Sequence, residues 1–154
     1  MGISGILLKN KDEMNFEKLI RDIKCAAHQA NIVCLEGLEF EKNNDGTYEY
    51  MTFILAEKEQ DGNEFLIYAY NDTDDMIDGM FSFINEKKNY QQCINIESFK
   101  STKILLDFIY EYMKLNKDDI FYDELNWHYT FEEIEYIANM GTYDAQWCYK
   151  KPQE

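Results

Sequence analysis

The feature that most constrains the fold is a pair of strand-like segments, residues 47–56 and 64–70, joined by a turn. Both segments are rich in aromatic and β-branched residues, and Asp61 and Gly62 lie between them. An Asp-Gly pair between two such segments is a strong signal of a β-hairpin. Around Phe53, apolar residues at alternate positions are separated by residues that are themselves partly apolar. This pattern is typical of a central strand with helices covering one face.

The rest of the chain extends this hairpin into an α+β fold with a mostly antiparallel sheet. Turn residues at 43–46 join the hairpin to a preceding strand at residues 32–41, so that residues 32–71 form a central meander. Short apolar segments at residues 3–9 and 93–96 predict further strands of the sheet. Apolar residues also recur at helical spacing. The spacing predicts four helices, near residues 15–30, 74–88, 101–115 and 130–140.

Several local signals mark where the predicted helices begin and end. Asn15 is a predicted N-cap, Thr130 and Glu133 match a capping box, and Gly141 is placed to follow the last helix. Residues 117–129 lack a regular pattern and predict an extended loop or an edge segment. We expect the helices to cover one face of the sheet, and the C-terminal segment or a partner to cover the tyrosine-rich face.

Composition indicates one acidic domain over residues 1–154. The formal net charge is −15, from 30 acidic and 15 basic residues, and the aromatic content is 16%. Such a charge repels nucleic acid and anionic membranes and attracts basic partners. Residues 1–9 resemble neither a signal peptide nor a transmembrane span, so we expect a cytoplasmic protein without a membrane partner. Cys25, Cys34, Cys93 and Cys148 have no paired spacing of the kind that a zinc site requires.

Motifs for catalysis or cofactor binding are scarce. The sequence has no phosphate-binding glycine motif and no basic stripe for nucleic acid, and we expect no cofactor. The aspartates of residues 71–79 lack the order of a calcium-binding loop, and a helix start explains them more simply than the alternative of opportunistic calcium binding. His128 lies near Asp123 and Glu124, so a small enzyme that uses His128 with these carboxylates, or with a cysteine, is an alternative. A plain strand with alternating aromatic and polar residues explains the same segment.

Acidic and aromatic residues accumulate together in residues 117–136. Tyr and Trp dominate binding hot spots, and carboxylates around them attract an Arg/Lys-rich partner. The alternative is that the aromatic residues point inward and the acidic residues are solvated. The predicted partner-binding residues are Asp118, Asp119, Phe121, Tyr122, Asp123, Glu124, Trp127, His128, Glu132 and Glu133.

In size, charge and this acidic-aromatic segment, the chain resembles the small acidic immunity proteins that accompany secreted bacterial toxins. The resemblance implies a protein without catalytic activity or bound metal that forms a one-to-one complex with a basic, nuclease-like toxin and blocks its active site. A nucleic-acid mimic that inhibits a DNA-binding protein is a related alternative. A structural or regulatory subunit with a solvated acidic face is another.

Overall fold

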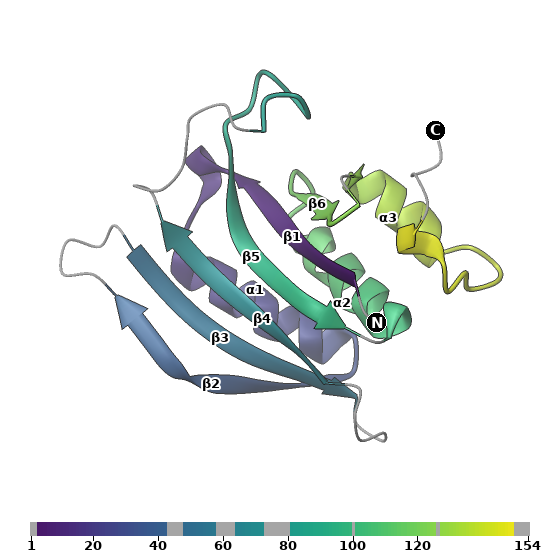
Figure 1. Ribbon diagram of the computed structural model, residues 1–154, viewed down its shortest axis with the longest axis horizontal. Helices are drawn as coiled ribbons and strands as arrows, with labels where there is room; N and C mark the ends of the chain where they lie inside the picture. Colours follow the sequence, from purple (N-terminus) through teal and green to yellow (C-terminus); the bar gives the residue numbers. More distant parts are fainter. Residues whose placement is uncertain are drawn as a thin grey trace.

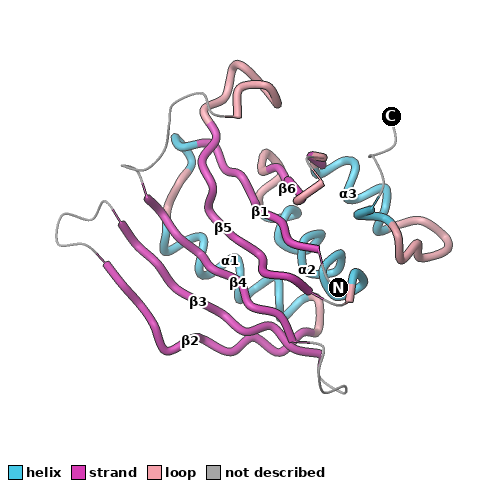
Figure 2. The backbone as a smooth tube through the Cα atoms, in the orientation of Figure 1, coloured by secondary structure: helices cyan, strands magenta, loops and turns pink. Residues whose placement is uncertain are grey.

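A seven-stranded antiparallel sheet forms the centre of the computed structural model, which describes residues 3–42, 48–57, 64–72, 81–99, 101–125 and 127–149. The strand order is β2-β3-β4-β5-β1-β6-β7 (Figures 1 and 2). The α+β class and the β2-β3-β4 meander are therefore as predicted, although the predicted turns at residues 43–46 and 61–62 lie outside the described residues. The strands are β1 (Ile3–Asn10), β2 (Ile32–Lys42), β3 (Tyr48–Glu57), β4 (Glu64–Asp72), β5 (Tyr90–Phe99), β6 (Ile120–Asp123) and β7 (His128–Tyr129).

The helices α1 (Phe16–Gln29), α2 (Thr102–Leu115) and α3 (Phe131–Ala138) pack next to one another, and α1 and α2 lie behind the sheet in Figure 1. Their first turns are fixed by side-chain caps. The side chain of Asn15 accepts a hydrogen bond from the backbone N–H of Lys18, and Thr130 with Glu133 forms a complete capping box. Both predicted caps are thus confirmed. Short 3-10 helices occupy Lys11–Glu13 and Trp147–Tyr149.

The main core lies between the helices and one face of the sheet. Leu7 of β1, Phe53 of β3 and Phe121 of β6 are fully buried there with the apolar sides of the helices. At Gly5, a Cβ atom would lie 2.6 Å from the ring of Phe121, so the β1–β6 pairing requires a residue without a side chain at this position. Trp147 closes the same core, because its ring contacts those of Phe121 and Tyr129.

We call the opposite face of the sheet the outer face. A second, small cluster lies on it, where Phe81 packs with Leu8 of β1 and Ile120 of β6. Residues 81–89 make this contact as turns. The predicted helix at residues 74–88 is therefore wrong over residues 81–88, and residues 73–80 lie outside the described residues. The side chain of Asn85 accepts a hydrogen bond from the backbone N–H of Lys87, and such local bonds compete with helix formation.

Two further expectations need correction near the C-terminus, and one alternative is confirmed there. Helix α3 is capped by Asn139, so Gly141 lies one residue beyond the position predicted for it. Residues 117–129 include the strands β6 and β7 at one edge of the sheet, so the edge-segment alternative is confirmed and the extended loop is not. As far as residue 149, where the description ends, the C-terminal segment packs into the helix-side core through Trp147 and not onto the tyrosine-rich outer face, which leaves the alternative of a partner there.

Candidate protein-binding surface

A continuous row of side chains crosses the outer face from β3 to β7. Each member is the direct cross-strand partner of the next, so the row is fixed by the register of the sheet. We call it the cross-sheet row, and its members in order are Thr52, Tyr68, Asn95, Ile6, Tyr122 and His128. At its β3 end, Gly37 of β2 closes over Thr52, because a Cβ at Gly37 would lie 1.8 Å from the Thr52 hydroxyl. From Tyr68 to His128 the side chains are only partly buried.

An aromatic cluster stands at the β7 end of this row. It consists of Phe81, Phe83, Tyr122 and His128, and the ring of Phe83 lies 6.0 Å from that of Tyr122 and 6.4 Å from that of His128. Phe83 is 64% exposed although it contacts both rings. Aromatic side chains are enriched at the buried centres of protein–protein interfaces.

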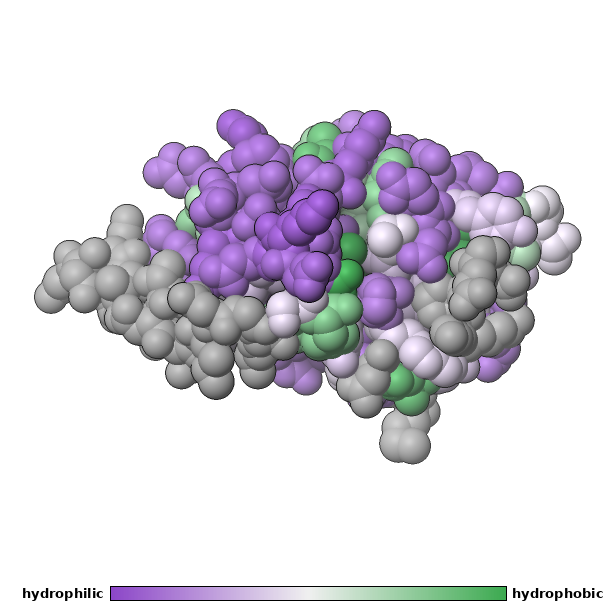
Figure 3. Space-filling model, turned by 90° about the horizontal axis from the view of Figure 1, so that it is seen from above, coloured by the Kyte–Doolittle hydropathy of each residue, from purple (hydrophilic) through white to green (hydrophobic). Residues whose placement is uncertain are grey.

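Aliphatic side chains form a second exposed patch near the β2 edge. Leu35, Ile54 and Leu66 are direct cross-strand partners on the outer face, and the exposed fraction is 54% for Leu35 and 36% for Ile54. Figure 3 shows an adjoining side of the molecule, on which hydrophilic residues predominate among the coloured residues and hydrophobic residues emerge only in small patches. The outer face thus combines exposed apolar side chains from several strands.

The structure distributes the predicted partner-binding residues over different environments. Tyr122 and His128 lie in the aromatic cluster, and the neighbouring Glu124 is exposed on the same side. Trp127 packs against the main core, and Glu133 belongs to the α3 cap. Asp118 and Glu132 are exposed elsewhere, and Asp118 pairs with Lys88 at 3.7 Å. The buried members are Asp119, Phe121 and Asp123.

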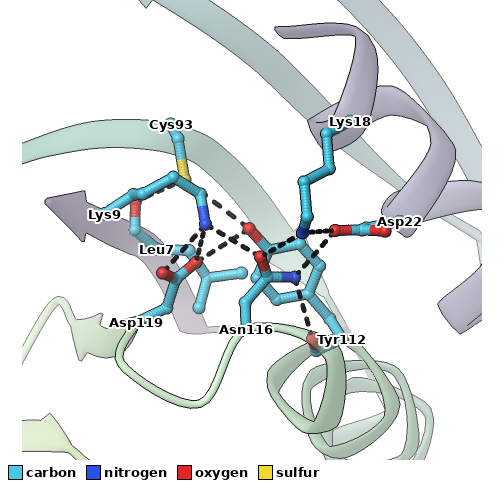
Figure 4. A network of polar contacts seen from close by, with 8 residues as sticks. All are labelled: Leu7, Lys9, Lys18, Asp22, Cys93, Tyr112, Asn116 and Asp119. Carbon is cyan, nitrogen blue, oxygen red and sulfur yellow. Dashed lines mark hydrogen bonds and ion pairs between the residues drawn. The ribbon is translucent and has the colours of Figure 1, made fainter. Parts of the chain in front are cut away.

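Asp119 is part of a buried polar network that joins β1, α1 and α2 (Figure 4). The Lys9 ammonium donates hydrogen bonds of 2.9 Å to Asp119 and to Asn116, and the Tyr112 hydroxyl donates one of 2.8 Å to Asp119. Asn116 also donates to Asp22 of α1 at 3.2 Å. Burial raises the pKa of Asp119 from 3.8 to about 6, although Lys9 acts in the opposite direction. These contacts give Asp119 a structural role.

Asp123 organises the connection between β6 and β7. Its carboxylate accepts hydrogen bonds from the backbone N–H groups of Leu125 at 2.9 Å and Trp127 at 3.1 Å, and from the Tyr129 hydroxyl at 3.4 Å. Burial raises the pKa of Asp123, and these hydrogen bonds counteract the effect. Because Asp123 is only 1% exposed, it shapes the loop next to the aromatic cluster and offers little surface of its own.

The arrangement separates His128 from Asp123, one of the two carboxylates of the enzymatic alternative. Asp123 lies on the helix side of β6, whereas His128 pairs with Tyr122 on the outer face, so this carboxylate and the imidazole are on opposite faces of the sheet. Burial raises the pKa of the Cys93 and Cys148 thiols to about 12, which keeps both thiols neutral near pH 7. In the described parts of the chain, no three His, Cys, Asp or Glu side chains are grouped to hold a metal ion.

Neither Phe83 nor the cross-sheet row could be recognised in the sequence as part of a surface. Helical spacing places Phe83 on an inward stripe, and the row depends on pairings between distant strands. Within the described ranges, no helix is long and apolar enough to cross a membrane. Comparisons with protein-family models, with curated proteins and with solved structures give no match to this chain.

Proposed function

We propose that this chain is a non-catalytic binding protein that neutralises a basic partner protein through the outer face of its sheet. The partner that best fits the composition is a cognate nuclease-like toxin, which would make the chain an immunity protein. The observation that carries the proposal is the exposed aromatic cluster at the end of the cross-sheet row, in a protein of formal net charge −15.

The aromatic cluster supports binding better than it supports solvation. An acidic face that is only solvated requires no exposed aromatic residue. Here, by contrast, Phe83 is 64% exposed and its ring contacts those of Tyr122 and His128. Such rings bury a large apolar area with few rotatable bonds when a partner covers them, so they contribute strongly to affinity. The half-buried tyrosines of the cross-sheet row would extend the contact across the sheet.

Charge supports a basic partner. Carboxylates around an apolar centre steer a partner of opposite charge and exclude partners of like charge. Proteins that bind nucleic acid present a basic surface to its phosphates. A toxin nuclease and a DNA-binding protein therefore share a basic surface of the kind that this chain would recognise. The proposal thus also covers the alternative that the chain is a nucleic-acid mimic.

The proposal is tested by capture from the lysate of the source cell at about 50 mM and about 500 mM salt, followed by mass spectrometry. We expect a basic protein to be retained in near-equal amount and to bind more weakly at the higher salt, because screening shortens electrostatic attraction. With the captured partner purified, Phe83→Ala should weaken binding at least tenfold, as for a hot-spot residue.

Tyr136→Ala is the matched control, because Tyr136 is 60% exposed on α3, away from the outer face. It should leave affinity unchanged. If no basic protein is retained at either salt concentration, or if Tyr136→Ala weakens binding as much as Phe83→Ala does, the proposed function or its placement on the outer face is wrong.

A further inference from the structure

A shallow hollow lies on the outer face where β1 and β6 meet, next to the aromatic cluster. Ile6, Asn95 and Tyr122 of the cross-sheet row line it together with Ser4 and Glu124. Its volume is about 220 Å³. Pockets that enclose a drug-sized ligand have about 300–1,000 Å³, so this hollow has room for one amino-acid side chain.

The rim of the hollow is negatively charged. Glu124 is exposed, and its backbone N–H donates a 3.0 Å hydrogen bond to the Ser4 carbonyl, which holds this end of β6 against β1. Glu97 is also exposed and lies two positions beyond Asn95 on β5, at an irregularity in the β1–β5 register. Among the described residues that line the hollow there is no lysine or arginine. An apolar floor with the Glu124 carboxylate at its rim therefore suits the side chain of an amphipathic cation.

We propose that the hollow is the binding site for one arginine side chain of the partner, an inference that rests on the proposed function. The aliphatic stem of the arginine would lie on Ile6, and its guanidinium would meet the ring of Tyr122 and the carboxylate of Glu124. A guanidinium suits this site better than an ammonium, because it is planar, stacks on aromatic rings and binds a carboxylate through two parallel hydrogen bonds. The Asn95 side-chain carbonyl offers a further acceptor.

The test is a titration of the isotopically labelled protein with N-acetylarginine amide, followed through the backbone amide NMR signals. We expect saturable shifts at Ser4, Ile6 and Asn95. N-acetylcitrulline amide has nearly the same shape without the charge and should cause none. Glu124→Gln should weaken the arginine derivative at least fivefold, and Glu132→Gln, a matched change of an exposed carboxylate on α3, should not.

Shifts that are absent, equal for the citrulline derivative or spread over all acidic surfaces would overturn the arginine site. The arginine site would also be overturned, in favour of a general cation site, if Nα-acetyllysine amide, which keeps its side-chain ammonium, binds as tightly as the arginine derivative. The proposed function is judged separately by the captured partner. If Glu124→Gln leaves the partner's affinity unchanged while Phe83→Ala weakens it, the arginine site fails and the binding function stands.

Discussion

The buried ion pair between Lys9 and Asp119 allows a sharp test of the structure. The two side chains are 5% and 1% exposed, and the ammonium and carboxylate approach to 2.9 Å. Replacing Lys9 by Met keeps the length of the side chain and removes its charge, which leaves the Asp119 carboxylate buried with the Tyr112 hydroxyl as donor. Breaking one partner of a buried pair costs about 3–5 kcal/mol. We expect Lys9→Met to lower the free energy of unfolding by about this amount at pH 7.

The loss should depend on pH in a defined direction. Burial raises the folded-state pKa of Asp119 from 3.8 to about 6, so the folded protein binds this proton more tightly than the unfolded chain does. The resulting stabilisation is complete below pH 3.8 and is lost as the pH rises through about 6. Lys9 lowers the pKa of Asp119, so this pKa is higher in the Lys9→Met variant. The stabilisation from the bound proton is therefore lost at a higher pH in the variant. At pH 5 the carboxyl is largely protonated in both proteins, and the cost of Lys9→Met should shrink.

Urea unfolding followed by far-UV circular dichroism at pH 7 and pH 5 measures both effects. The double variant Lys9→Met/Asp119→Asn removes both charges and should cost at least about 2 kcal/mol less than the sum of the single variants. A cost for Lys9→Met below about 1 kcal/mol at pH 7, or an equal cost at the two pH values, would refute the reasoning.

Two further predictions concern the core and the β6–β7 connection. Phe53→Ala should cost about 3–5 kcal/mol of unfolding free energy because Phe53 is fully buried between sheet and helices, and a cost below about 1.5 kcal/mol in urea unfolding would contradict its place in the core. Asp123→Ala should cost about 2–4 kcal/mol, because it removes the acceptor of two backbone N–H groups and one acceptor of the Tyr129 hydroxyl, which also bonds to the Trp147 carbonyl. Glu124→Ala, at the exposed neighbouring position, should change stability by less than about 0.5 kcal/mol, and equal costs for the two variants would speak against the role of Asp123.

The parts of the fold that depend on local signals were predictable. The meander follows from alternation and turn residues, and the caps at Asn15 and Thr130 follow from side chains that bond within three residues. The helix predicted at residues 74–88 fails over residues 81–88 because Phe81 matches helical spacing but packs on Leu8, a residue far away in the chain. Periodicity alone does not distinguish these two uses of an apolar side chain.

The site was less predictable, because its environment is made by distant partners. Asp119 reads as a surface acid, yet its ion-pair partner Lys9 lies 110 residues earlier in the chain. Asp123 lies in the same acidic and aromatic segment of the sequence and would be expected at the surface, but it is buried at the β6–β7 connection. Tyr122 and His128 were identified as candidates from their acidic surroundings, and the structure adds Phe83, which joins them through a contact between separate segments.

The strand order also has a consequence for how the chain folds during synthesis. The meander β2-β3-β4 pairs neighbours in sequence, so it can form before the later strands have been synthesised. β1, by contrast, sits between β5 and β6, so residues 90–99 must be synthesised before it has a partner on one edge and residues 120–123 before it has a partner on the other. Pairing across such a separation is slow. Leu7 and Leu8, which are fully buried in the folded protein, therefore gain their partners in the sheet only after these strands have been made, and the formal net charge of −15 opposes association of the unfinished chain.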